Sequence, residues 1–231
     1  MKSLVITGGS AGIGYNTAKL FYESDYKVIN LSRRSCDIDG VINISCDLSD
    51  LRSLTNIGGQ LKESIGDSRK ITLIHNASKM NNDKVDSATA ESFREVLEIN
   101  LVAPNILNQL CIPLMKPDSA ILYVGSTLSE KAVPGSFSYV TTKHAVIGMM
   151  RATCQDLIGR HIHTACICPG FTDTEMLREH VPEEAMPTIV GMSAFNQLIS
   201  PGEIAETLFW VAEHPVTNGS VLHANLGQKE Q

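Results

Sequence analysis

The chain has neither a long apolar run nor an excess of positive charge. No hydrophobic run in its 231 residues reaches the length of a membrane span, which takes about 20 apolar residues. The net charge is −6 and the isoelectric point is about 5.6, values that argue against a general nucleic-acid or anionic-membrane binder. The start, MKSLVITGG, enters a strand-like run and lacks a signal-peptide cleavage region. We therefore expect a soluble cytoplasmic protein without nucleic-acid or membrane partners.

The chain has six cysteines, which lie mostly inside apolar segments. In a reducing cytosol such residues act as small buried hydrophobic groups rather than as disulfides. The segment HIHTACIC has a metal-ligand composition, with His161, His163, Cys166 and Cys168. It has the pattern of a strand, however, and successive side chains of a strand point to opposite faces. The histidines and the cysteines would face apart, so we expect no metal site.

Short β-rich runs alternate with longer helical patterns along the chain. A hydrophobic content of 43% and a charged content of 19% are typical of a folded globular chain. The expected strands cover 3–7, 27–32, 41–46, 70–75, 119–126, 162–168 and 220–224. The expected helices cover 12–23, 49–65, 88–115, 137–158 and 201–213. Because the strands are apolar nearly throughout, this pattern predicts a single α/β domain over 1–231, with a doubly wound parallel sheet of about seven strands flanked by helices.

The longest irregular stretch lies at about 171–200 and contains Pro182 and Pro187. We interpret it as a flap over a substrate site, and the alternative is an ordinary surface excursion. Five apolar residues could either line a pocket or pack the flap itself. They are Val133, Phe137, Met176, Met192 and Phe195.

A glycine-rich turn, TGGSAGIG (7–14), follows the first expected strand and opens a helix. A helix N-terminus presents free N–H groups and positive potential to a phosphate. Gly8 and Gly12 allow a tight turn and a close approach to a ligand, and Gly14 lets the helix lie close to the sheet. The strand–turn–helix context is the one that a dinucleotide-binding turn requires.

TGGSAGIG matches the TGxxxGIG cofactor turn of the short-chain dehydrogenases/reductases at every fixed position. The chain resembles that family over nearly its whole length, and the resemblance implies a Rossmann-type fold with a nicotinamide dinucleotide cofactor. Within the turn, it implies cofactor contacts for Gly8, Ser10, Gly12, Ile13 and Gly14.

The second expected strand ends in NLSRR, with Ser32, Arg33 and Arg34. In dinucleotide-binding folds an acid near this point holds the adenosine ribose, whereas a basic residue accommodates a 2′-phosphate. An arginine fork suits a phosphate, so the pattern favours NADP(H) over NAD(H). Members of the family often add a basic residue inside the glycine turn, where this chain has Ala11. The alternative interpretation is a pair of solvated charges.

The fourth expected strand runs into HNAS (75–78), which is similar to the family pattern NNAG. The resemblance implies that Asn76, together with Ala77, lies beside the cofactor. His75 and Ser78 depart from the pattern. Ser78 adds a side chain where backbone usually passes close to the cofactor, and we interpret His75 as a buried structural residue.

Further cofactor contacts are implied after the third and sixth expected strands. The third strand ends in CDL, where Asp47, followed by Leu48, resembles the family's acid whose contacts reach the adenine ring. The sixth strand ends in CPGFTDT, which matches the family's PGxxxT beside the nicotinamide carboxamide. The implied contacts there are Pro169, Gly170, Thr172 and Thr174.

Two tyrosine–lysine pairs share the same spacing, YNTAK (15–19) and YVTTK (139–143). Spacing alone does not distinguish them, because each puts the two side chains one helical turn apart. Nothing upstream of Tyr15 supplies a polar strand end, and Lys19 is most easily interpreted as facing solvent. The first pair is therefore expected to be an ordinary helix pattern.

The second pair has a polar partner upstream. Ser126 stands thirteen residues before Tyr139, at the carboxyl end of the fifth expected strand, and ligands of open α/β sheets bind outside such ends. The Ser–Tyr–Lys spacing is similar to the active-site pattern of the family. Asn100, in EVLEINLVAP, matches its fourth member.

The residue types fit acid–base chemistry at a carbonyl. A free tyrosine has a pKa of about 10, and a neighbouring ammonium such as Lys143 favours the phenolate. Tyr139 would give a proton to a carbonyl oxygen or take one from an alcohol, and Ser126 would hydrogen-bond the same oxygen. The resemblance implies that Lys143 also reaches the nicotinamide ribose and that Asn100 orders a water connected to Lys143.

These patterns predict an NADP(H)-dependent oxidoreductase that acts on a small carbonyl compound or secondary alcohol. The general resemblance extends to the 3-oxoacyl-acyl-carrier-protein reductases. The alternative is a non-catalytic NADP(H)-binding sensor or assembly subunit on the same fold, which has no chemical need for Ser126 and Tyr139 together. Members of the family are commonly homodimers or homotetramers, so the resemblance also implies an oligomer.

Overall fold

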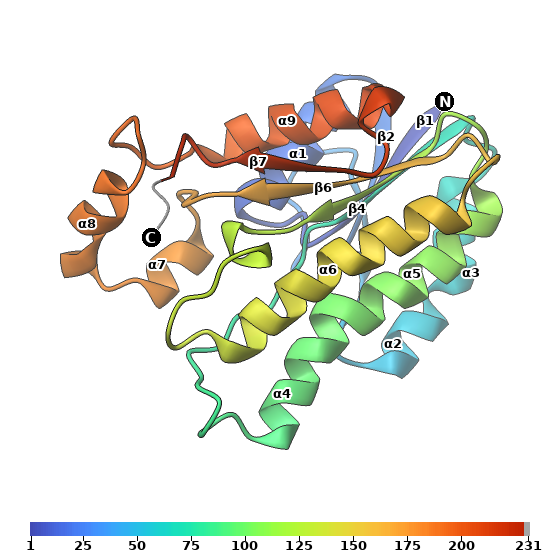
Figure 1. Cartoon of the computed structure of the whole chain (residues 1–231). Coiled ribbons are helices and arrows are strands. Elements are labelled where there is room, and N and C mark those ends of the chain that lie inside the picture. Colours follow the sequence, from blue (N-terminus) through green and yellow to red (C-terminus); the bar gives the residue numbers. More distant parts are fainter. Residues whose placement is uncertain (229–231) are drawn as a thin grey trace.

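The computed structural model describes residues 1–228, and a parallel sheet of seven strands forms its centre (Figure 1). The strand order is β3-β2-β1-β4-β5-β6-β7. The strands are β1 (Lys2–Thr7), β2 (Tyr26–Ser32), β3 (Ile42–Ser45), β4 (Lys70–His75), β5 (Ala120–Val124), β6 (His163–Pro169) and β7 (Ser220–Ala224). The chain runs from the middle of the sheet to one edge and then from the middle to the other. This order confirms the predicted doubly wound, Rossmann-type α/β sheet.

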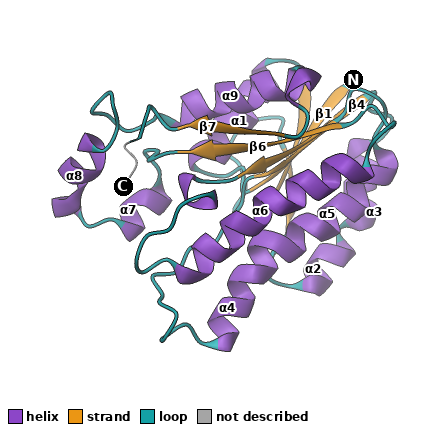
Figure 2. Ribbon diagram, viewed as in Figure 1, coloured by secondary structure: helices purple, strands orange, loops and turns teal. Residues whose placement is uncertain are grey.

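Helices lie on both sides of the sheet, as Figure 2 shows. On one side, α1 (Gly12–Glu23) packs against α9 (Pro201–Glu213). The other side carries α2 (Leu51–Asn56), α3 (Gly58–Ile65), α4 (Ala90–Leu97), α5 (Ala103–Cys111) and α6 (Phe137–Asp156). Alternation along β1 serves both layers, because Leu4 and Ile6 pack with α1 and α9 while Val5 packs on the opposite face.

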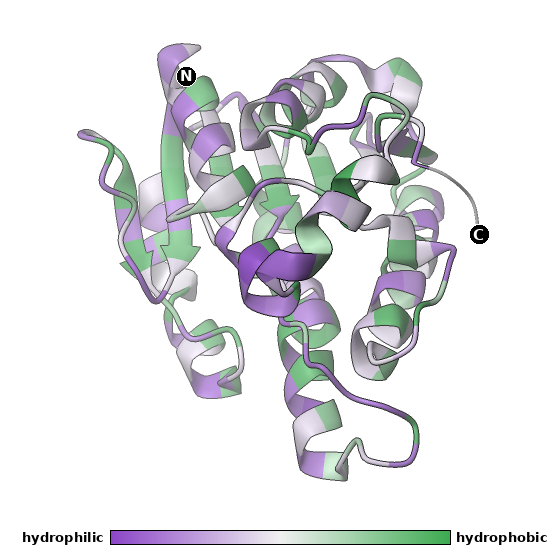
Figure 3. Cartoon of the chain, turned by 90° about the vertical axis from the view of Figure 1, so that its left-hand side faces the viewer, coloured by the Kyte–Doolittle hydropathy of each residue, from purple (hydrophilic) through white to green (hydrophobic). Residues whose placement is uncertain are grey.

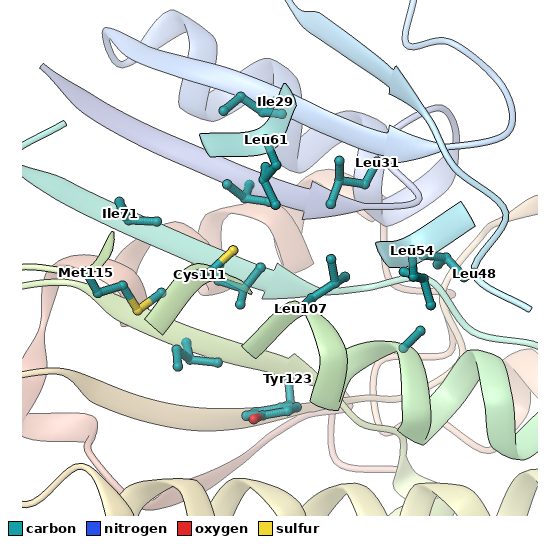
Figure 4. Close-up of a cluster of buried hydrophobic side chains, with 14 of the residues drawn as sticks. Ile29, Leu31, Leu48, Leu54, Leu61, Ile71, Leu107, Cys111, Met115 and Tyr123 are labelled. Atoms are coloured by element: carbon teal, nitrogen blue, oxygen red, sulfur yellow. The ribbon is translucent and has the colours of Figure 1, made fainter. Parts of the chain in front are cut away.

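The larger apolar cluster fills the space between the sheet and helices α2, α3, α5 and α6 (Figure 4). It brings Leu61 and Leu107 from the helices against Ile71 and Tyr123 from the strands, and all four side chains are almost completely buried. The central strands are hydrophobic over most of their length (Figure 3). Full burial of one such side chain contributes about 1.5–3 kcal/mol. The sheet is therefore a packed platform, and the turns at its ends carry the polar residues.

The structure divides two segments that the sequence pattern predicted as continuous helices. The segment 49–65 forms α2 and α3 with Ile57 between them, followed by two glycines of weak helix propensity. The segment 88–115 contains α4, a π-helical turn η1 (Glu98–Val102), α5 and a 3-10 turn η2 (Ile112–Leu114). The π-helical turn inserts extra backbone into the helix at the position of Asn100.

The stretch 171–200 is less irregular than expected. It contains α7 (Glu175–His180), a 3-10 turn η4 (Glu183–Ala185) and α8 (Met186–Gly191). Pro182 precedes η4 and Pro187 lies in the first turn of α8, where a missing N–H costs little. The prolines therefore begin helical turns here.

Two further 3-10 turns are η3 (Thr127–Ser129) and η5 (Pro215–Thr217). No helix formed by residues 1–228 is both long and apolar enough to cross a membrane.

Candidate active site

A cleft of about 1490 Å³ opens at the carboxyl edge of the sheet. Residues that follow each of the strands β1 to β6 line it together with residues of α7. Parallel strands end at one edge, so side chains that are far apart in the sequence meet there. Every residue that we expected to contact the cofactor lines this cleft, and so do Ser126, Tyr139 and Lys143. Asn100 is buried behind the lining, with 4% of its surface exposed.

The glycine turn has the geometry of a phosphate cradle. Gly12 has a φ of +53°, a conformation that side chains other than glycine rarely adopt. A Cβ on Gly14 would lie 2.1 Å from the Gly8 carbonyl oxygen, so only glycine lets α1 start this close to β1. Ala11 occupies the N-cap of α1 and no side chain caps the helix, which leaves its first N–H groups to a ligand. These features fit the pyrophosphate of a dinucleotide.

The end of β4 holds this turn in place. The backbone N–H groups of Asn76 and Ala77 both donate to the Thr7 hydroxyl oxygen, each at 3.0 Å. The Asn76 side-chain Nδ2 donates to the carbonyl oxygens of Thr7 at 3.0 Å and Gly8 at 3.2 Å. The amide hydrogens of Asn76 are thus both donated to the glycine turn, so Asn76 stabilises the shape of the cleft as well as lining it.

The two arginines after β2 have different surroundings, and one of them is paired with a carboxylate of α7. Ser32 Oγ donates to the Arg34 carbonyl oxygen at 2.5 Å and thereby fixes the backbone after the strand. The Arg34 guanidinium forms an ion pair with Glu175 of α7 at 3.0 Å between Nη2 and Oε2. Arg33 lines the cleft beside them. Nothing in the sequence pattern indicates Glu175 as a partner of Arg34, because the two residues are 141 positions apart.

Asp47, after β3, is held in its ionised form. Its Oδ1 accepts hydrogen bonds from Ser49 Oγ at 2.7 Å and Ser49 N at 2.9 Å. These two bonds, with a smaller contribution from the charge of Arg33, hold the pKa of the Asp47 carboxyl below its ordinary value. Asp47 is therefore an anion with a fixed orientation on the lining of the cleft.

Tyr139 and Lys143 lie one turn apart near the start of α6, and both are buried. Lys143 Nζ donates to the Val124 carbonyl oxygen at the end of β5, at 2.7 Å. The same nitrogen lies 5.4 Å from the centroid of the Tyr139 ring, within the range of a cation–π contact. The carboxyl end of β5 thus anchors the lysine, and the lysine places a positive charge beside the phenol.

Ser126 follows β5 and is the N-cap of the turn η3. Its Oγ accepts a hydrogen bond from Leu128 N at 3.1 Å, and its own N–H donates to Ser129 Oγ at 3.1 Å. A hydroxyl that accepts one bond still carries a hydrogen to donate. The cap therefore orients the Ser126 hydroxyl in the cleft while leaving its hydrogen for a ligand.

Asn100 lies in the π-helical turn η1, and its side chain is fully occupied. Its Oδ1 accepts hydrogen bonds from Lys79 N at 2.7 Å and Ser78 Oγ at 3.2 Å. Its Nδ2 donates to the Lys79 carbonyl oxygen and to Thr142 Oγ1, each at 2.9 Å. These are all the bonds that one amide can make. Ser78, noted in the sequence only as a departure, is thus part of the support of Asn100.

His75 is a buried structural residue, as its sequence position suggested. Its Nε2 lies 2.9 Å from Asn108 Oδ1, and Asn108 Nδ2 donates to the Tyr123 hydroxyl at 2.8 Å. Because Asn108 donates with its nitrogen, its oxygen accepts from the His75 ring. Burial lowers the pKa of His75 to about 4, so the ring is neutral at physiological pH.

The segment HIHTACIC belongs to β6 from His163 onward, whereas His161 lies in the preceding turn with a φ of +54°. His163 Nε2 lies 2.9 Å from the Val211 carbonyl oxygen, whereas Cys166 and Cys168 belong to the cluster on the other face. In residues 1–228, no three His, Cys, Asp or Glu side chains come together as metal ligands would. All six cysteines are buried and unpaired.

Comparisons with known proteins agree with this architecture. The family model described as short chain dehydrogenase matches residues 2–185. Carbonyl reductase family member 4 of Xenopus tropicalis is 25% identical, and the match covers 100% of this chain and 99% of that protein. The 3-oxoacyl-acyl-carrier-protein reductase FabG of Thermotoga maritima is also 25% identical, over 96% of this chain and 95% of its own.

The fold has a close structural counterpart as well. A short chain dehydrogenase family protein from Francisella tularensis superimposes with a TM-score of 0.90, at 24% identity over 98% of both chains. The family model covers most of the chain, and the dinucleotide cradle and the residues around it occupy one cleft. The chain belongs to the short-chain dehydrogenase/reductase family, a family of oxidoreductases whose fold binds a nicotinamide cofactor and acts on small molecules.

Proposed function

We propose that the protein is an NADP(H)-dependent oxidoreductase acting on the carbonyl group or secondary alcohol of a small molecule. The observation that carries the proposal is that Ser126, Tyr139 and Lys143 line the same cleft as the glycine turn. When bound, the nicotinamide supplies or accepts the hydride. The chain's own residues bind and orient the reactants and move the proton.

Tyr139 is the proposed general acid for reduction and general base for oxidation. Its burial and its place at the start of α6 fix the phenol on the cleft wall. The Lys143 ammonium, 5.4 Å from the ring centroid, stabilises negative charge that develops on the phenol oxygen as the proton leaves. Because Lys143 is itself held by the Val124 carbonyl oxygen, this charge keeps its position through the reaction.

Ser126 is the proposed second contact of the reacting oxygen. Its hydroxyl hydrogen would bond the oxygen that gains charge during reduction. Asn100 is proposed to support proton exchange from behind the cleft. Because its side chain is saturated by Ser78, Lys79 and Thr142, any water that Asn100 holds would meet its backbone rather than its amide.

Arg33 and Arg34 are proposed to bind the 2′-phosphate of NADP(H). Both line the cleft after β2, where a dinucleotide fold places the adenosine ribose. The Arg33→Ala variant should weaken NADPH binding by about tenfold or more while changing NADH binding little, as fluorescence titration of each cofactor would measure. Equal losses for the two cofactors would contradict the assignment.

We further propose that the chain forms a single domain in which 171–200 acts as a substrate flap. Val133, Met176 and Met192 line the cleft, which supports a role in holding substrate. Two other apolar candidates do not line it. Phe137 packs against Phe93 with tilted rings, 5.6 Å between ring centroids, and Phe195 is 68% exposed.

The cellular setting and assembly are proposals that rest on family resemblance. We propose a cytoplasmic homodimer or homotetramer, and light scattering on the purified chain would give its mass in solution. No observation in the described residues favours the alternative of a sensor or assembly subunit without catalysis.

A panel of ketones, aldehydes and 3-oxoacyl thioesters tests the reaction class. Each compound is mixed with the protein and NADPH, and the loss of NADPH absorbance is followed. We expect turnover of at least one carbonyl compound, with NADPH preferred over NADH. Absence of turnover across the panel in both directions, with cofactor bound, would contradict the proposed activity.

A further inference from the structure

An ion pair crosses the cofactor cleft and ties the loop after β2 to α7. Arg34 Nη2 lies 3.0 Å from Glu175 Oε2, and both residues line the cleft. The side chains are 66% and 64% exposed, so water and an incoming ligand can reach both. An exposed ion pair of this kind is weak and readily exchanged for another partner.

Glu175 is placed where a bound dinucleotide would pass. It follows Thr174, whose side-chain oxygen caps α7 by accepting from Leu177 N at 3.3 Å. A Cβ on Gly12 would lie 3.1 Å from Thr174 Cγ2, so the start of α7 sits against the glycine turn. Glu175 is the first residue of α7 and follows this contact directly, so it stands at the inner end of the flap, with its carboxylate on Arg34.

Another carboxylate of the flap, Asp173, has its ion-pair partner within the flap, unlike Glu175. Asp173 pairs with Arg178 of its own segment, with Oδ1 2.6 Å from Nη2 and 3.0 Å from Nε. Its charge is thereby balanced within the flap. The charge of Glu175 is balanced by Arg34, one of the two arginines proposed to bind the 2′-phosphate.

We propose that Glu175 is a cofactor-specificity residue, which competes with the 2′-phosphate of NADP(H) for Arg34 and so lowers selectivity over NAD(H). The inference rests on the proposed use of the arginines for that phosphate. A dianionic phosphate that binds the guanidinium fork competes with Glu175 Oε2 for Nη2, and the carboxylate is a like charge nearby. NAD(H) carries no 2′-phosphate and leaves the pair intact.

The same exchange has a structural consequence. The Arg34–Glu175 pair is a direct tie between the β2 loop and the start of α7. Competition for Arg34 would weaken this tie in the NADP(H) complex and leave it in place in the NAD(H) complex. The first turn of α7 is therefore freer in the NADP(H) complex.

The test is a double-mutant cycle on cofactor binding. Dissociation constants for NADPH and NADH are measured by fluorescence for the parent, Glu175→Gln, Arg34→Ala and the double variant. Glu175→Gln should tighten NADPH by about twofold to fivefold and leave NADH unchanged within error. The gain should shrink as salt is raised and should largely vanish when Arg34 is absent.

Glu184→Gln is the matched control, because it removes the same charge from an exposed position of the flap segment outside the cleft. It should leave the ratio of the two dissociation constants unchanged. The inference is overturned if Glu175→Gln leaves the preference for NADPH over NADH as in the parent or shifts it toward NADH. It is also overturned if Glu175→Gln has the same effect as Glu184→Gln, or if its full effect persists when Arg34 is absent.

The outcome also separates this inference from the proposed function. If Arg34→Ala and Arg33→Ala affect both cofactors alike, the phosphate assignment itself fails. If the arginine variants weaken NADPH alone while Glu175→Gln does nothing, only the role of Glu175 fails. Binding measurements need no substrate, so neither result depends on finding the compound that the enzyme reduces.

Discussion

Two tyrosine–lysine pairs with the same spacing have opposite surroundings in this protein. In α1, Tyr15 packs against the apolar cluster beneath the helix, and the Lys19 side chain is 54% exposed. In α6, Tyr139 and Lys143 are both buried, with 8% and 3% of their surfaces exposed. The sequence presents the same two residue types at the same interval. Only the fold separates a surface charge from a buried one.

The difference comes from what stands opposite each helix. The end of β5 faces the start of α6 and contributes the carbonyl oxygen of Val124, which binds Lys143 at 2.7 Å. It also contributes Ser126, whose hydroxyl lies in the same cleft. Within residues 1–228, Lys19 forms an ion pair with Glu23, one turn further along its own helix, at 3.9 Å. A tyrosine–lysine pair is thus a candidate for chemistry where a strand end supplies its partners.

The largest effect that this comparison predicts is for the two tyrosines. Tyr139→Phe should lower turnover by about 10²–10⁴-fold, because the phenylalanine ring keeps the packing and loses the proton. Cofactor affinity should change little. Tyr15→Phe is the matched control and should keep the parent's turnover. Steady-state kinetics together with cofactor titration would measure both, and a fully active Tyr139→Phe would refute the proposed mechanism.

Removing Ser126 would make the surroundings of the α6 pair more like those of the α1 pair. Ser126→Ala should lower kcat by about 10²-fold, since one hydrogen-bond donor to the reacting oxygen is lost. Ser126 and Ser129 also form a reciprocal cap of η3, so the cap alone could matter. Ser129→Ala breaks that cap from a position outside the cleft. Equal losses in the two variants would show that Ser126 acts only through the cap.

Much of the site could be predicted because it depends on patterns that are local in sequence. The glycine turn, Ser126 and the Tyr139–Lys143 pair each follow or face a strand end that apolar residues define. A parallel sheet gathers such ends at one edge, so predicting the strands also predicted the cleft. The cleft residues that directly follow strand ends could be predicted from the sequence for this reason, whereas Glu175 of α7 could not.

The features that could not be predicted are tertiary contacts between distant residues and a local irregularity of a helix. The Arg34–Glu175 pair joins the loop after β2 to the start of α7, and the two side chains meet only after folding, at an interval that no pattern encodes. The π-helical turn at Asn100 has no separate sequence signature within a helical pattern. Ser78 donates one of the four hydrogen bonds that saturate the Asn100 amide, whereas its sequence position identified it only as a departure from the family pattern.

His75 is a third case: it is titratable and buried like Lys143, but it has no proposed role in the reaction. Its pKa in the folded protein is about 4, below the ordinary value of 6.5, so the unfolded chain takes up the proton first as pH falls. This contribution to stability is fully present above pH 6.5. It should be lost progressively between about pH 6.5 and pH 4, by an amount on the order of 3 kcal/mol.

Urea unfolding at several pH values would measure this loss. His75→Asn should be less stable at neutral pH because a packed ring is removed, but it should show a shallower fall in stability between pH 6.5 and pH 4. His144→Asn, at an exposed position of α6, is the matched control and should keep the parent's fall. An unchanged fall in His75→Asn would show that other groups cause the pH dependence.

The smallest effect is expected for the lysine of the α1 pair. Lys19→Gln removes an exposed ion pair with Glu23, which contributes about 0.3–0.5 kcal/mol at most in such helices. The urea midpoint should barely move, and turnover should stay within about twofold of the parent, because Lys19 faces solvent rather than the cleft. A large loss of turnover in Lys19→Gln would show that the α1 pair takes part in the reaction. It would contradict the conclusion that a tyrosine–lysine pair needs a strand end opposite it.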